Sequence, residues 1–317
     1  MRLSTLAALA GLMTAPVLAF GTVEGLGQSS EHEKITRLGL MVFHIGRDTM
    51  DSLAGERGAF GAVGAPDRPD RGLMSDQAAH CDGGDYVGSP GYPQSKAEAE
   101  ARLTACRDFI FTALDAAVTA AGRIVPENTL TIMEDEIPSM IPCVYDGSSG
   151  RAKCDVLEQL GLAFHASQDF YSHTNWVDVP GPGALTADNP AGLGKSDTAS
   201  FIDPSFKGPF PDGLISGCYD GFPESQHCTY NGDWVRVKHA VLNKDNGPID
   251  PMNGATGPGT TPRGAINGNF ERAVLAAASD TRSKWAWFQG ELLVVYGPER
   301  GRLIRCAIEK DDPDECR

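Results

Sequence analysis

The sequence predicts an all-α protein: a multi-helix bundle with long loops, stapled by disulfides. Stretches rich in Ala and Leu, with apolar residues at helical spacing, recur along the 317-residue chain. Between them lie stretches dense in Gly, Pro, Asn and Asp that show no sustained period. Eight cysteines fall in neighbouring pairs, which is typical of local disulfides in an exported protein.

Residues 1–19 have the pattern of a cleaved secretory signal. A basic Arg2 precedes an apolar run broken by Pro16, and the small residue Ala19 stands before Phe20. The run is too short to span a bilayer, and no later stretch of the sequence replaces it. We therefore expect a periplasmic or secreted protein whose residues 20–317 form a single domain.

The first expected helix begins after Ser30. The string Ser-Glu-His-Glu matches a capping box in which Ser30 is the N-cap and Glu33 stands three residues on. Apolar residues from Ile35 onward follow at helical spacing, so His32 lies in the first turn. A loop rich in Gly, Pro and Asp is expected from about residue 55 to residue 93.

Three more long helices are expected along the chain. A capping box at Ser95 opens an Ala-rich helix to about Gly122, and a further helix covers about residues 153–176. Residues 177–265 lack a period, and we expect them to be long functional loops in which any strands are short. The last helix starts at about Asn269.

The cysteine positions suit four local disulfides, although sequence alone leaves the connectivity of eight cysteines open. A structural zinc-thiolate site is the weaker interpretation because no Cys-x-x-Cys spacing occurs. Neighbour pairing would join Cys81 with Cys106, Cys143 with Cys154, Cys218 with Cys228, and Cys306 with Cys316.

The chain is strongly acidic, with a formal net charge of -15 at pH 7. Bound divalent cations would cancel part of this charge locally. The field farther away should repel long polyanions, so we do not expect duplex nucleic acid as a partner.

Residues 160–176, LGLAFHASQDFYSHTNW, carry the main chemical signal. His165, Asp169 and His173 stand four residues apart in a helix-compatible run, so they share one stripe of the helix and rise by roughly 6 Å each. Such a stripe suits two or three neighbouring metal ions, with the central carboxylate as a bridge. The alternative is a polar seam satisfied by hydrogen bonds alone.

Together with other positions, this helix resembles the zinc-dependent phospholipase C superfamily, to which the fungal single-strand nucleases belong. The resemblance rests on the string FHASQD within residues 160–176, on Phe20 at the expected mature N-terminus, on His32 a dozen residues later, and on His239 downstream. The helix and the string KHAVLNKD, residues 238–245, look most like the heterokaryon-incompatibility C (Het-C) branch.

The resemblance implies a cluster of two or three zinc ions. In this superfamily the mature N-terminal residue binds zinc through its α-amino group, and a free amine is a far better ligand than an amide nitrogen. The implied ligands are Phe20 and His32 at one metal, His165 and Asp169 at the central metals, and His173 with His239 at another.

Two departures from the superfamily pattern leave ligands to be assigned. The gap between Asp169 and His173 is shorter than in phospholipase C. Asn243 also stands where the superfamily has a Glu four residues after the later His, and Asp245 is a substitute for it. The resemblance further implies a His from the loop region, His80, accompanied by either Asp76 or Asp82 as a carboxylate ligand. We favour Asp76, which would also orient the attacking water.

These observations favour an exported zinc-dependent phosphoesterase, acting like phospholipase C on phospholipid head groups with peripheral contact to a membrane. One alternative is a Het-C-like recognition or toxic protein that is not catalytic and holds structural metal. A second alternative is a single-strand nuclease. The remaining histidines, His44 and His227, are expected to be packed or surface residues and not ligands.

Overall fold

The computed structural model describes residues 20–25, 28–57, 59–138, 142–219, 228–229 and 236–316. The predicted signal over residues 1–19 lies outside the described residues, as does His227. The described chain is mostly helical, as predicted, with a few very short strands.

The helices differ widely in length. They are α1 (Glu31–Leu40), α2 (Arg47–Ala54), α3 (Lys96–Ala121), α4 (Ala152–His173), α6 (His239–Leu242), α7 (Asn269–Tyr296) and α8 (Pro298–Glu309). Short 3-10 helices are η1 (Ala62–Asp67), η2 (Pro69–Arg71), η3 (Glu134–Glu136), η4 (Ser200–Ile202) and η5 (Pro313–Cys316). The strands form three antiparallel pairs: β1 (Glu24–Gly25) with β2 (Gln28–Ser29), β3 (Gly55–Glu56) with β4 (Ala59–Phe60), and β5 (Ile249–Asp250) with β6 (Gly254–Ala255).

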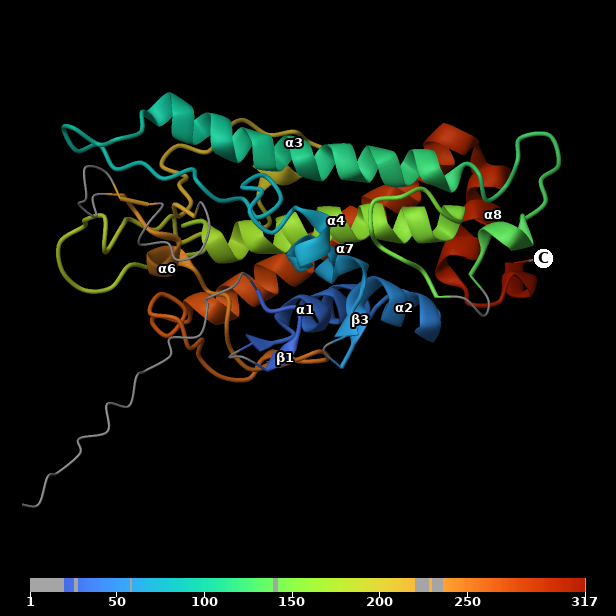
Figure 1. The fold of residues 1–317 in the computed structure, drawn as a ribbon, viewed down its shortest axis with the longest axis horizontal. Helices are drawn as coiled ribbons and strands as arrows, with labels where there is room; N and C mark the ends of the chain where they lie inside the picture. Colours follow the sequence, from blue (N-terminus) through green and yellow to red (C-terminus); the bar gives the residue numbers. More distant parts are fainter. Residues whose placement is uncertain are drawn as a thin grey trace, which may run out of the picture.

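Helix α4 runs through the middle of the molecule (Figure 1). It packs against α3 on one side and α7 on another, while α1 lies against α7 and η1 lies on α4. All but two residues of α4 are buried, which explains why this helix is apolar around most of its circumference. Its polar residues therefore face the interior.

The starts of the helices test the two capping boxes. At α3 the prediction is confirmed: the Ser95 hydroxyl accepts the Glu98 N–H at 3.2 Å, and the Ser95 N–H donates to the Glu98 carboxylate at 2.8 Å. At α1 it is wrong. Ser30 precedes the helix but adopts a left-handed conformation with φ 52°, and its side chain makes no cap hydrogen bond. Glu33 accepts a hydrogen bond from Arg37 instead, at 3.1 Å.

Helix α4 ends at His173, earlier than the expected residue 176. Thr174 is extended, and both its N–H and its hydroxyl donate to the carbonyl of Phe170, at 3.2 Å and 2.6 Å. The Thr174 N–H makes the last helical hydrogen bond, and the extended backbone of Thr174 then turns the chain out of the helix. His173 is therefore the last helical residue, at the point where the loops begin.

The four disulfides join the neighbouring cysteines, as predicted: Cys81–Cys106, Cys143–Cys154, Cys218–Cys228 and Cys306–Cys316. Four disulfides indicate an oxidising compartment outside the cytoplasm. Among the described residues, no helix combines the length and the apolar character that crossing a membrane requires.

Candidate metal centre

Helix α4 places three ligand side chains on one stripe. His165, Asp169 and His173 follow one another at intervals of four residues, and each is at most 1% exposed. η1 can lie on this helix because residue 161 is glycine: a Cβ there would lie 2.3 Å from a backbone carbon of η1. The close approach brings Asp67, the last residue of η1, toward His165.

A first group of ligands surrounds the middle of the stripe. His80 Nδ1 lies 2.9 Å and His165 Nε2 lies 3.2 Å from Asp169 Oδ2. His32 Nε2 lies 3.3 Å from the other oxygen, Asp169 Oδ1, and Asp67 Oδ1 lies 3.8 Å from His165 Nε2. We call these five residues the His165 site. Within it, the ligand atoms of His80, His165 and Asp169 all lie within 4.8 Å of one another.

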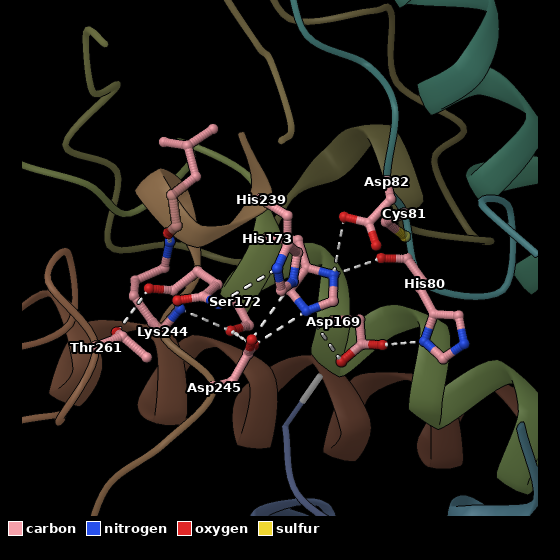
Figure 2. A network of polar contacts seen from close by, with 12 residues as sticks. His80, Cys81, Asp82, Asp169, Ser172, His173, His239, Lys244, Asp245 and Thr261 are labelled. Atoms are coloured by element: carbon pink, nitrogen blue, oxygen red, sulfur yellow. Dashed lines mark hydrogen bonds and ion pairs between the residues drawn. The ribbon is translucent and has the colours of Figure 1, made fainter. Parts of the chain in front are cut away.

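A second group surrounds the end of α4, where side chains from the loop before α3 and from α6 and the loop after it converge (Figure 2). His173 Nε2 lies 3.0 Å from Asp245 Oδ1, and His239 Nε2 lies 3.4 Å from Asp245 Oδ2. Asp82 Oδ1 lies 3.3 Å from His173 Nδ1. We call these four residues the His173 site.

Asp169 joins the two sites. Its Oδ2 contacts imidazoles of the His165 site, whereas its Oδ1 lies 3.3 Å from His32 Nε2 and 3.8 Å from His173 Nε2. One carboxylate therefore faces imidazoles of both sites. This is the arrangement in which a carboxylate can bridge neighbouring metal ions.

The imidazoles are oriented by partners on their far sides. His32 Nδ1 lies 2.7 Å from Gln168 Oε1, and the Gln168 amide nitrogen donates to two threonine hydroxyls. His165 Nδ1 lies 2.9 Å from the Val63 carbonyl, and His173 Nδ1 lies 2.7 Å from a carbonyl of the loop before α3. Because each Nδ1 faces an oxygen that can only accept, Nδ1 carries the proton and Nε2 is left to bind a metal.

The charges of the two sites are strongly coupled. Burial opposes ionisation of Asp169, but the neighbouring imidazoles of His173 and His165 outweigh it and hold the pKa of this carboxyl well below its ordinary value. Burial also opposes protonation of His80, yet its contact with Asp169 raises the pKa of the imidazole to about 9. The proton on His80 thus helps to balance the charge of Asp169, and a divalent cation would compete with this proton for the same position.

Several buried atoms of both sites have no hydrogen-bond partner among the described residues. Leaving such atoms unpaired costs roughly 1 to 3 kcal/mol each, and mixed imidazole and carboxylate donors are typical metal ligands. The donor set therefore suits divalent metal ions. The atoms are His32 Nε2, Asp67 Oδ2, His80 Nε2, Asp82 Oδ1, Asp169 Oδ1 and Asp245 Oδ2.

Phe20, the expected mature N-terminus, lies beside the His165 site. Its buried ring stands 5.8 Å from the ring of His32, edge to face. The Gly21 carbonyl accepts the His32 N–H at 3.2 Å, and the Gly21 N–H donates to the buried Glu31 carboxylate at 3.0 Å. The same carboxylate accepts N–H groups from Ser29 and from the loop that follows Asp245. Glu31 thus fixes the backbone next to Phe20.

The structure brings together most of the residues that the sequence analysis selected. His32, His80, His165, Asp169 and His173 converge as described, and so do His239 and Asp245.

Asp76 is the selected residue that the structure leaves apart. Its carboxylate accepts the Ala78 N–H at 2.9 Å in a local turn, and it belongs to none of the ligand groups among the described residues. Asp82, the alternative carboxylate, is in the His173 site. His44 is exposed, which is one of the two alternatives, packed or surface, that the sequence left open.

Sequence reasoning missed Asp67. It lies in the string APDRPD, which reads as a turn because aspartate beside proline usually forms one. The contact of η1 with Gly161, which places Asp67, is a long-range feature that no local pattern announces.

Comparisons of the chain with protein-family models, with curated proteins and with solved structures each gave no match. The interpretation of the two sites therefore depends on their own residues and geometry.

Proposed function

We propose that the chain is an exported zinc-dependent phosphoesterase that hydrolyses phospholipid head groups. The observation that carries the proposal is Asp169, whose carboxylate faces imidazoles of both sites. Ions held in the two sites would be neighbours, and adjacent divalent cations suit phosphoester hydrolysis. The available donors match two or three zinc ions.

In this proposal the metal is held by ring nitrogens of the five histidines of the two sites and by the carboxylates of Asp82, Asp169 and Asp245. Bound zinc would supply charge stabilisation at phosphoryl oxygens and lower the pKa of water toward neutrality. Asp67 is our candidate for the proton acceptor. At 9% it is the most exposed carboxylate of the two sites, and its Oδ2 has no hydrogen-bond partner among the described residues. Asp67 takes the role expected for Asp76.

A second candidate is a Het-C-like recognition or toxic protein in which the metal is structural. The burial of the ligands favours it, since every side chain of the two sites is at most 9% exposed. Structural metal sites are closed, whereas catalytic zinc keeps a coordination position for water or substrate. In this case the long loops between α4 and α7 would engage the partner.

The test is metal analysis followed by hydrolysis assays on the processed protein. We expect two or three zinc ions per chain and turnover of phosphatidylcholine vesicles, with the protein sedimenting with the vesicles. His165→Ala should lose zinc and reduce turnover by at least about 100-fold. His44→Ala is the matched control because His44 is exposed and outside both sites.

The outcomes separate the candidates. Protein that contains no zinc, or His165→Ala with unchanged turnover, would overturn the proposal. Tightly held zinc without turnover of lipid or single-stranded DNA would favour the structural role. Turnover of single-stranded DNA alone would make the chain a nuclease, although its net charge of -15 opposes polyanion binding.

A further inference from the structure

A buried lysine lines a cavity at the other end of α4. Lys153, in the first turn, is 2% exposed and contacts a cavity of about 490 Å³. Twelve residues separate it from His165, which corresponds to about 18 Å along a helix axis. The cavity also contacts α2 and the segment that follows α8, so it is distinct from the metal centre.

Lys153 differs from the other buried lysines of the described chain. Lys244 and Lys284 are completely buried, and each forms an ion pair with a buried aspartate, at 2.8 Å and 2.5 Å. The ammonium of Lys153 instead donates to the carbonyl of Lys310 at 2.6 Å and forms no ion pair with a described residue. Lys244 and Lys284 are neutralised by a partner, whereas Lys153 is not.

The environment of Lys153 favours the neutral amine. Burial lowers its pKa to about 8, while the carboxylates of Asp311 and Asp48 act in the opposite direction. Asp311 also accepts the N–H groups of Asp48 and Thr49 at the start of α2, so its charge is shared with that helix end. At pH 7 a much larger fraction of the Lys153 amine is therefore neutral than of the amine of an exposed lysine.

We propose that Lys153 is a covalent binding site for a small uncharged aldehyde. The amine nitrogen attacks the carbonyl carbon and forms a C–N bond. Water then leaves with the carbonyl oxygen and both amine hydrogens, and the product is an imine. The step needs no oxidant or reductant. The cavity volume is within the usual range for small-molecule sites.

The charge of the cavity defines which carbonyl compounds it accepts. Asp48, Asp311 and Asp312 line it together with Lys153. Once the lysine is neutral, these carboxylates leave the cavity negative, so anionic carbonyl compounds are repelled. An uncharged aldehyde meets no such barrier.

The full-length protein is incubated at pH 7 with glycolaldehyde and cyanoborohydride, which reduces the imine to a stable amine that peptide mass spectrometry detects. We expect Lys153 to be labelled at least 10-fold faster than the exposed Lys195 and Lys207, with a half-maximal rate near pH 8. Lys244 and Lys284 should be labelled last. Replacing glycolaldehyde with anionic glyoxylate should slow labelling of Lys153 more than labelling of Lys195.

Two variants sharpen the test. Lys153→Arg removes the labelled site and assigns the signal. Asp48→Asn removes a charge that favours the ammonium, so it should increase the labelling rate of Lys153 at pH 7. Labelling of Lys153 no faster than that of Lys195 would overturn the proposal. Labelling of Lys153 at the same rate as Lys244 and Lys284 would also overturn it, because these buried lysines react only when the protein unfolds. Equal slowing by glyoxylate at Lys153 and Lys195 would overturn the charge selection.

Discussion

The His165 site and the His173 site share Asp169 but are built from different kinds of structure. The His165 site draws His32 from α1, Asp67 from η1 and His165 from α4, so packed helical elements position most of it. The His173 site takes one ligand from the end of α4 and the others from loops or from the four-residue α6. We infer that helix packing holds the ligands of the His165 site in place, whereas the His173 site depends on a disulfide and a buried ion pair.

A disulfide and a buried ion pair lie next to the His173 site. The Cys218–Cys228 disulfide is next to it in the backbone, because the His239 N–H donates to the Cys218 carbonyl at 3.0 Å. Lys244, beside Asp245, is buried and lies 2.8 Å from Asp178. Its ammonium also donates to carbonyls at the end of α4 and in α6. The Cys218–Cys228 disulfide and the Lys244–Asp178 ion pair thus hold the loops of the His173 site, where helix packing holds the His165 site.

The largest expected effect is loss of both sites in Asp169→Asn. The substitution keeps the shape of the side chain but removes the charge that faces imidazoles of both sites. We expect metal affinity to fall by more than about 100-fold at each site, measured by equilibrium dialysis with zinc. Asp76→Asn is the control, and it should bind zinc normally. Full occupancy of either site in Asp169→Asn would show that the sites do not share this carboxylate.

The next effect is on stability, in Lys244→Met. Removing the ammonium leaves Asp178 buried with Arg263 as its remaining partner, at 2.8 Å. Arg263 still compensates the Asp178 charge, but one ion pair and the hydrogen bonds of the ammonium to two carbonyls are lost together, so the free energy of unfolding should fall by about 3 to 5 kcal/mol. Urea denaturation measures the change. Zinc binding should weaken at the His173 site and persist at the His165 site, and equal loss at both would contradict the comparison.

A smaller effect is expected when the Cys218–Cys228 disulfide is replaced by two serines. Loss of the disulfide that closes this loop should reduce the free energy of unfolding by about 2 to 4 kcal/mol. It should also weaken zinc binding at the His173 site but not at the His165 site. The matched control is Cys143→Ser with Cys154→Ser, because this pair lies at the other end of α4. That control should lose similar stability while both sites keep their zinc affinity. Loss of zinc in the control would refute the selective role.

The last expected effect is a pH dependence with opposite signs in the two forms of the protein. In the metal-free protein the pKa of His80 is about 9, above its ordinary value of 6.5. Its contribution to stability is therefore complete below pH 6.5 and is lost as the pH rises through about 9. Zinc binding requires deprotonated imidazoles and should strengthen over the same range. Thermal unfolding from pH 6 to 9.5 measures the stability of the zinc-bound protein without chelator and of the metal-free protein with chelator. The same pH dependence in both forms would contradict the competition between protons and zinc.

The sequence predicts the helical site better than the loop-built one, for physical reasons. The α4 stripe follows from a fixed helical period, and the capping box of α3 is a local interaction. The separate start of α2 was not predicted, because its first N–H groups bind Asp311, which lies 263 residues away from Asp48. Long-range contacts of this kind also place Asp67.

The choice between Asp76 and Asp82 shows the same limit. Both carboxylates lie near His80 in a stretch without a helical or strand period, so spacing alone ranks neither. A local turn holds Asp76, and the fold turns Asp82 toward His173. Only the folded arrangement separates these alternatives.

Cys81 stands between His80, which serves the His165 site, and Asp82, which serves the His173 site, and its disulfide ties that junction to Cys106 in α3. The Cys81–Cys106 disulfide should therefore form before the two sites bind zinc. A newly made chain with reduced thiols would not yet present both ligands, so under the proposed export it should not withdraw zinc from the cytoplasm. Zinc uptake by the unfolded, reduced chain, followed while it refolds with and without an oxidant, tests this order. Full uptake before the Cys81–Cys106 bond forms would exclude it.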